Sequence, residues 1–170
     1  MENVTEEKKA RIASEKAVKY FFFLALLNAI AAVAFTVPIL LPQLEFPILL
    51  TEWPGIYIVI AYTSFIVAGV LGMVAWSSGY YLMWRVFGVS TTSRGLITAQ
   101  ILLTQAGIYA LTLFMYWGGY VGAHASHEGI AIFIVGQLME FSVIPSGLGI
   151  VLLLLGTMTG LLNILLMLRK

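Results

Sequence analysis

The sequence contains no cysteine and no aspartate, and only two of its 170 residues are histidine. Without cysteine the chain can form neither disulfide bonds nor thiolate metal sites, so the redox conditions of its compartment leave no trace in the sequence. The chain has nine lysines and arginines and eight glutamates, which gives a formal net charge of +1. This balance offers no strongly basic surface for nucleic acid, and we expect no nucleic acid partner.

Charged residues are scarce as a whole. They make up 10% of the chain, whereas hydrophobic residues make up 61%. An ordinary soluble domain has about 25% charged and about 45–50% apolar residues. We therefore predict an all-α integral membrane protein whose helices form a bundle.

Four apolar stretches are long enough to cross the hydrocarbon core of a bilayer, which takes about 20 residues per helix. The predicted spans cover residues 18–41, 55–86, 95–120 and 148–168. The apolar sequence from residue 129 to residue 168 would be about 60 Å long as one straight helix, too long for a simple span. Because Pro145 removes a backbone donor, we expect a break there. Residues 129–144 are then predicted to form a short interfacial or re-entrant helix on the outer side, with one long, Pro-kinked helix as the alternative.

The basic residues decide the orientation of these spans. With four crossings, all nine fall on one side of the membrane, because the first and third connections contain none. The positive-inside rule assigns this side to the cytoplasm. We therefore predict a multi-pass protein of the cell membrane with both termini cytoplasmic. Residues 1–17 are predicted to form a charged cytoplasmic helix, and residues 18–170 a single four-helix transmembrane domain.

Small residues recur at a spacing of four on two of the spans. They are Ser64, Ala68 and Gly72 in the second span, and Gly156 and Gly160 in the last. Helices in lipid associate through such residues, because small side chains let two backbones come close. We interpret both sets as packing seams, either within this bundle or with another subunit.

The third span carries a polar face that includes Gln105 and Tyr109. A polar face in a membrane helix either forms hydrogen bonds between helices or lines a path for protons, substrate or quinone. Asn28, in the first span, is interpreted as a helix-packing group. Glu140 is the one ionisable residue that we place at membrane depth, where such groups are costly and commonly functional. It is either a proton relay or ligand, or a structural carboxyl group that anchors the segment before Pro145.

The stretch from residue 122 to residue 129, GAHASHEG, holds both histidines. His124 and His127 are three residues apart, so on a helix they share a face and could bind one metal ion, with Glu128 or the deeper Glu140 adding oxygen. They cannot ligate opposite faces of one haem. The stretch is therefore a polar outer turn, a part of a metal, haem or quinone site completed by another subunit, or a self-contained metal site. We expect no cofactor on the isolated chain.

These features favour a small subunit of a larger membrane enzyme complex, most of all a respiratory or other redox complex. Four spans with almost no soluble domain leave much surface for other integral membrane subunits and for the lipid bilayer, and no complete catalytic set is present, so we expect no catalysis by the chain alone. On this view the chain packs against a main subunit and assists a cofactor, quinone or proton path at the outer face. The alternative is a homo-oligomeric channel or transporter that uses the polar face of the third span and Glu140.

The predicted orientation can be tested with single cysteines, since the chain contains none of its own. Cysteines placed at Gln43 and Ser126 should react with a membrane-impermeant maleimide added from outside intact cells, because both positions lie in connections without basic residues. Labelling is read by a mass shift on a gel. Protection of both positions until the membrane is opened would contradict the orientation.

Overall fold

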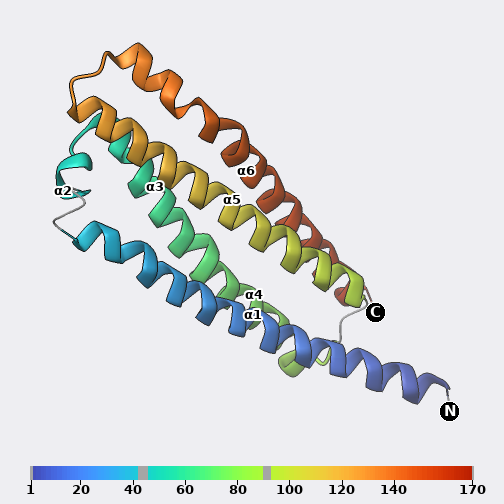
Figure 1. The fold of residues 1–170 in the computed structure, drawn as a ribbon. Coiled ribbons are helices and arrows are strands. Elements are labelled where there is room, and N and C mark those ends of the chain that lie inside the picture. The colour runs from blue at the N-terminus through green and yellow to red at the C-terminus, as the bar shows by residue number, and fades with distance from the viewer. Residues whose placement is uncertain (1, 42–45, 90–92, 170) are drawn as a thin grey trace.

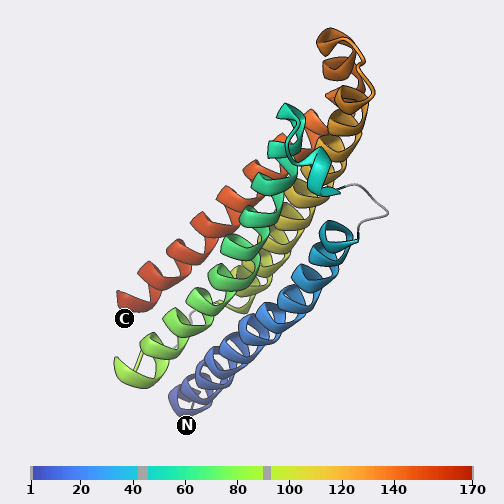
Figure 2. The same ribbon diagram turned by 90° about the vertical axis from the view of Figure 1, so that its left-hand side faces the viewer.

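The structure, a computed structural model, describes residues 2–41, 46–89 and 93–169. Within these ranges the chain contains no strand, and four helical rods are long and apolar enough to cross a membrane. The rods lie side by side, and the two chain termini lie at the same end of the bundle (Figures 1 and 2). The all-helical class and the four candidate spans are thus confirmed. Part of the first predicted outer connection, including Gln43, lies outside the described residues.

The end of the bundle that holds both termini is called the proximal end here, and the opposite end the distal end. The first rod is α1 (Glu2–Leu40), followed by the short helix α2 (Phe46–Leu49) and a 3-10 turn, η2 (Trp53–Gly55). The second rod joins α3 (Ile56–Ser64), η3 (Phe65–Leu71), α4 (Gly72–Tyr81) and η4 (Leu82–Val86), of which η3 and η4 are π-helical. The third and fourth rods are α5 (Arg94–His127) and α6 (Ile132–Leu168).

Helix α5 ends in the GAHASHEG stretch through a glycine. Gly129 has a φ of +77°, a left-handed conformation that glycine adopts without steric cost. The N–H groups of Gly129 and Ile130 bond at 3.0 Å to the carbonyl groups three and five residues earlier, which is the Schellman pattern of a helix C-terminus. His124 and His127 therefore belong to the last helical turns of α5, and the turn itself begins only after them.

Helices α5 and α6 pack against each other over almost their whole lengths (Figure 1). Five buried residues of α6 recur at every seventh position: Val135, Ser142, Gly149, Gly156 and Asn163. A seven-residue repeat keeps one face of a helix turned toward its neighbour over many turns. A Cβ atom added to Gly149 would lie 2.8 Å from the carbonyl oxygen of Gly107, and one added to Gly156 would lie 2.9 Å from the backbone nitrogen of Thr104. Only glycine fits at these positions, so the two backbones come unusually close.

The separate short helix expected over residues 129–144 is not observed. From Ile132 onward these residues belong to α6, which continues through Pro145 as one helix, as in the alternative predicted above. A proline inside a helix removes one backbone hydrogen bond. The two halves of α6 nevertheless both pack on α5. Ser142 lies against Gly118 of α5 before the proline, and Gly149 lies against Gly107 after it. Contact with α5 therefore holds the two halves in one helix.

The main hydrophobic core lies among α1, the second rod and α5, and Met167 of α6 completes it. Its largest fully buried members are Phe21, Phe65, Met73, Tyr80 and Ile108. The rings of Phe21 and Tyr80 are stacked with centroids 5.5 Å apart. Ser77 donates a hydrogen bond of 2.9 Å to the backbone carbonyl of Val18, so the proximal parts of α1 and α4 are joined by polar as well as apolar contacts.

The predicted packing residues have different positions in this bundle. Gly156 and Gly160 are buried against α5 of the same chain. Ser64, Ala68 and Gly72 are only half-buried. The close approach on the second rod is made by the neighbouring Gly69, where an added Cβ atom would lie 3.4 Å from Ile108 and 3.5 Å from Asn28. The seam on α6 is thus internal to the bundle, and the seam on the second rod is displaced by one residue from the predicted face.

Substitution of Gly156 by alanine should lower the free energy of unfolding in detergent by roughly 1–3 kcal/mol, because the new methyl group would collide with the backbone of α5. Gly136→Ala on the same helix is the matched control, since a Cβ atom there would meet nothing within 4 Å. The control should be neutral or slightly stabilising, because alanine is the better helix former. Equal effects of the two substitutions on denaturant unfolding would contradict the close packing of α5 and α6.

Candidate functional site

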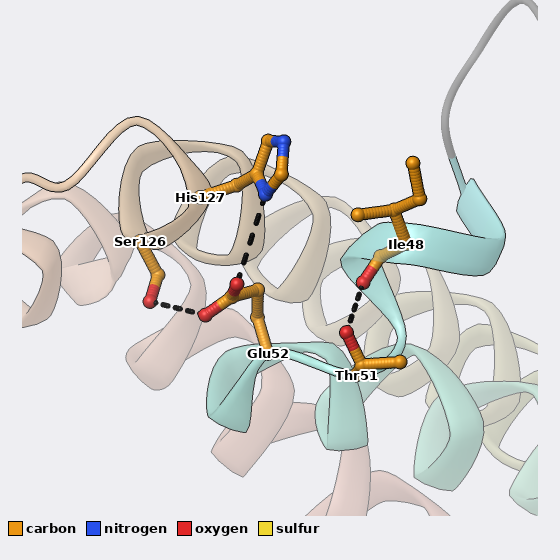
Figure 3. A network of polar contacts seen from close by, with 5 residues as sticks. All are labelled: Ile48, Thr51, Glu52, Ser126 and His127. Atoms are coloured by element: carbon orange, nitrogen blue, oxygen red, sulfur yellow. Dashed lines mark hydrogen bonds and ion pairs between the residues drawn. The ribbon is translucent and has the colours of Figure 1, made fainter.

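A polar network at the distal end ties the first connection to the end of α5 (Figure 3). The hydroxyl group of Ser126 donates a hydrogen bond of 2.8 Å to Oε2 of Glu52. Oε1 of the same carboxylate lies 3.7 Å from Nδ1 of His127, an ion pair whenever the imidazole is protonated. Beside it, Thr51 closes the turn after α2 by donating to the carbonyl group of Ile48 at 2.7 Å. Glu52 thus has two partners on α5.

The second histidine has a different carboxylate neighbour. Nδ1 of His124 lies 3.4 Å from Oε1 of Glu128, one turn later on the chain, and both side chains are about half exposed. The two imidazoles therefore do not share one carboxylate. In the part of the chain that the structure describes, no three histidine or glutamate side chains are placed to hold one metal ion. A metal site at His124, His127 and Glu128 stays a prediction, and its other ligands would have to come from another chain.

A buried polar cluster joins three helices near the proximal end. The Tyr80 hydroxyl group of α4 donates to Oε1 of Gln100 on α5 at 2.7 Å, and it accepts from Nδ2 of Asn163 on α6 at 3.0 Å. All three side chains are fully buried. Gln100 lies about 9 Å along α5 from Arg94, the first residue of that helix, so this cluster lies within the candidate span Arg94–His127. It links the second rod to the α5–α6 pair.

A second buried cluster surrounds Asn28, farther along the span. Its amide nitrogen donates to the carbonyl group of Gly69 at 2.6 Å and to Oε1 of Gln105 at 3.4 Å. Its amide oxygen accepts from the hydroxyl group of Tyr109 at 3.1 Å. Gly69 lies in the π-helical segment η3, and π-helical turns inside α-helices are frequent at functional sites. The structure thus brings the predicted residues Gln105 and Tyr109 together, with Asn28 as their shared partner.

Helix α5 also carries buried polar atoms that have no hydrogen-bond partner within the described ranges. They are Gln100 Nε2, Thr104 Oγ1, Gln105 Nε2 and Thr112 Oγ1. A buried polar atom without a partner costs free energy, more so where the surroundings are lipid. Helix α5 therefore carries most of the unpartnered buried polar atoms in the described part of the bundle. A proton or substrate path along this helix stays a prediction.

Glu140 is not part of these clusters. Its side chain is exposed on the distal half of α6. Gly107, two residues after Gln105, lies against Leu153 of α6, and the helix between Glu140 and Leu153 is about 20 Å long. The structure therefore does not bring Glu140 together with Gln105 and Tyr109.

A groove of about 400 Å³ opens near the distal end between the start of the second rod, α5 and α6. This distal groove is lined by Trp53, Tyr57, Met115, Gly136, Met139, Ser142, Val143, Ser146, Gly147 and Ile150. Its lining is mostly apolar, and a Cβ atom added to Gly136 or Gly147 would meet nothing within 4 Å. The hydroxyl oxygen of Ser146 is buried there without a partner among the described residues. The groove is therefore open along the glycine-containing face of α6.

No family model, no curated protein and no solved structure matches this chain.

Sequence reasoning did not predict that Tyr80, Gln100 and Asn163 bond to one another, or that Glu52 is the partner of His127. Gln100 and Asn163 are amides within apolar spans, and this was a usable signal, because such groups seek partners on neighbouring helices. Glu52 and His127 are far apart in sequence, but both lie in connections predicted to be outside the membrane. Their pairing follows only once the ends of the second rod and α5 are known to meet.

Removal of the Tyr80 hydroxyl group should destabilise the bundle. We expect Tyr80→Phe to lower the free energy of unfolding by about 1–2 kcal/mol, because the amides of Gln100 and Asn163 both lose a partner in a buried place. Tyr81→Phe is the matched control, because the exposed Tyr81 side chain contacts the ring of Trp84 and takes no part in the cluster. A loss with Tyr81→Phe as large as with Tyr80→Phe would contradict the role given to the cluster.

Proposed function

We propose that the protein is a subunit of a larger membrane complex and that it binds its partner through the distal half of α6 and the distal groove. The observation that carries this proposal is the length of α6 combined with its exposed apolar surface. A helix of 37 residues is about 55 Å long. The hydrocarbon core of a bilayer is only about 30 Å thick, so lipid tails cannot cover the whole helix.

The distal part of α6 is the part left without lipid cover. Arg169 directly follows α6 at its proximal end, where a basic side chain suits the membrane surface. About 20 residues from there carry the helix through the hydrocarbon core, to the region just after Pro145. Beyond it, Ile132, Phe133 and Ile144 are 69%, 68% and 73% exposed. Exposed apolar surface of this extent outside lipid indicates a protein interface.

The distal groove gives this interface a shape that fits an apolar helix. Gly136 and Gly147 leave the backbone of α6 open on the groove side, and small residues allow the backbone of a second helix to come close. Trp53 and Met115 form other parts of the groove, where a large apolar side chain of the partner would be buried. The occupant that we propose is one apolar helix of another integral membrane subunit.

The orientation and the kind of complex are parts of the same proposal. The proximal end holds both termini (Figure 2) and, among the residues whose side chains are described, Lys16, Lys19, Arg85, Arg94 and Arg169, which supports a cytoplasmic proximal end in a cell membrane. The distal end then faces outward and carries both histidines with Glu52 and Glu128. A partner that docks in the distal groove lies next to these side chains and could complete a metal, haem or quinone site there, as a respiratory or other redox complex requires.

The alternative function, a homo-oligomeric channel or transporter, takes second place. It would need Gln105, Tyr109 and Glu140 to line one path. Gln105 and Tyr109 bond instead to Asn28 inside the bundle, and Glu140 lies about 20 Å away along α6.

The docking proposal is tested by filling the groove. The double substitution of Gly136 and Gly147 by leucine should weaken association with the partner by roughly tenfold or more, because the new side chains occupy the space of the docked helix. Gly79→Leu is the matched control, since Gly79 also has nothing within 4 Å of an added Cβ atom but lies outside the groove. The readout is the size of the assembly after mild-detergent extraction, with membrane insertion measured in parallel.

A monodisperse monomer from the wild-type protein would contradict the proposal, and so would an unchanged assembly from the double variant. A photo-crosslinking residue at Val143 distinguishes binding to a different membrane protein from binding to a second copy of this chain. Crosslinks to a different membrane protein that disappear in the double variant support the subunit function. Crosslinks only to a second copy of this chain would overturn it in favour of the homo-oligomeric alternative.

A further inference from the structure

We propose that the protein binds one anionic phospholipid at the proximal end, with the lipid phosphate between Lys16 of α1 and Arg94 of α5. These two residues line a pocket of about 230 Å³ between the helices. The site is distinct from the distal groove and lies at the opposite end of the bundle. It does not depend on the proposed partner, but it rests on the part of the proposed function that places the four helices across a membrane with the proximal end cytoplasmic.

The charges at this pocket call for an anion. Lys16 and Arg94 are both exposed, and neither has a carboxylate partner in the part of the chain that the structure describes. Their neighbour Lys19, by contrast, is paired with Glu15 at 2.7 Å. Two cations on adjacent helices repel each other unless an anion lies between them. Phosphate oxygens fit best, because a guanidinium group and an ammonium group can both donate to them.

The start of α5 adds to this preference. Ser93 caps the helix by accepting from the N–H group of Leu96 at 3.3 Å, so α5 begins beside Arg94. The positive end of a helix dipole stabilises a nearby anion. Thr98, one turn after Arg94, also lines the pocket, and its side chain is exposed. A hydroxyl donor and two cations thus face the same space.

The rest of the pocket suits a lipid tail rather than a soluble phosphate. Helix α1 packs mainly against α4 and touches α5 only sparsely, so a furrow remains between α1 and α5. The small side chains of Ala13 and Ala17 leave space beside α1 here, and Ile97 and Ile101 form the wall on α5. The exposed ring of Tyr20 lines the same furrow. An acyl chain can continue from the headgroup along this apolar surface toward the membrane interior.

The depth of the pocket agrees with a headgroup at the membrane surface. Lys16 lies two residues before the first predicted span, and Arg94 is the first residue of α5. Basic pockets between transmembrane helices on the cytoplasmic side are recurrent sites for anionic headgroups. The phospholipid of the inner leaflet is therefore the occupant that we infer.

The inference is tested by native mass spectrometry of the purified protein after exchange into equal amounts of phosphatidylglycerol and phosphatidylcholine. The wild-type protein should retain phosphatidylglycerol in preference, and Lys16→Gln with Arg94→Gln should reduce this preference by roughly tenfold to thirtyfold. The matched control removes two charges from the same end outside the pocket, Lys19→Gln with Arg85→Gln, and should keep the preference. Thr98→Phe, which fills the pocket but leaves both charges, should lose bound lipid as well.

Equal retention of the two lipids by the wild-type protein would overturn the assignment, as would a preference that survives the Lys16 and Arg94 substitutions or falls equally in the control. Displacement of the lipid by millimolar inorganic phosphate would also overturn it, since the pocket would then be a site for a soluble anion. Circular dichroism of each variant reports whether the helices are retained.

Discussion

The close contact between α5 and α6 is the constraint on which the rest of the structure depends. Glycines at the contact bring the two backbones so near that an added methyl group at Gly149 or Gly156 would collide with main-chain atoms. In lipid there is little hydrophobic gain from joining two apolar helices, and association relies on such packing and on hydrogen bonds between helices. The same contact keeps α6 continuous through Pro145 and brings Asn163 to Tyr80 and Gln100.

Helix α5 serves two sets of neighbours. Its amides and hydroxyl groups bond to α1 and α4, and Asn163 of α6 joins the same proximal cluster through Tyr80, so the polar clusters join the bundle from the proximal end to its middle. On the distal side of Pro145, over residues 132–144, α6 packs mainly on α5 and has an exposed apolar surface beside the distal groove. At the proximal end, the sparse contact between α1 and α5 leaves the furrow with Lys16 and Arg94. Both proposed binding regions therefore lie where other helices do not pack closely against α5. The distal groove is the region for a protein partner, and the furrow between α1 and α5 is the region for a lipid.

The spans could be predicted because apolar length and the placement of basic residues both follow from the cost of burying charge in lipid. The continuous α6 helix was predicted only as the alternative, because Pro145 is a local signal for a break, whereas the contacts of Ser142 and Gly149 with α5 are tertiary. Gln105 and Tyr109 were found from their helical face, but their common partner Asn28 depends on the register of α1 against α5. Glu140 was expected at membrane depth, and this stays a prediction. In the continuous helix it lies about 43 Å from Arg169.

The continuity of α6 is the central claim, because the proposed interface exists only if the distal half extends beyond the lipid. It is tested most directly by a spin-label distance between cysteines placed at Phe133 and Leu165, which are 68% and 58% exposed on this helix. The absence of native cysteine makes both labels specific. An uninterrupted helix predicts a distance of about 48 Å with a narrow distribution. A distance below about 30 Å would mean that the segment before Pro145 folds back toward the membrane, which would contradict the account.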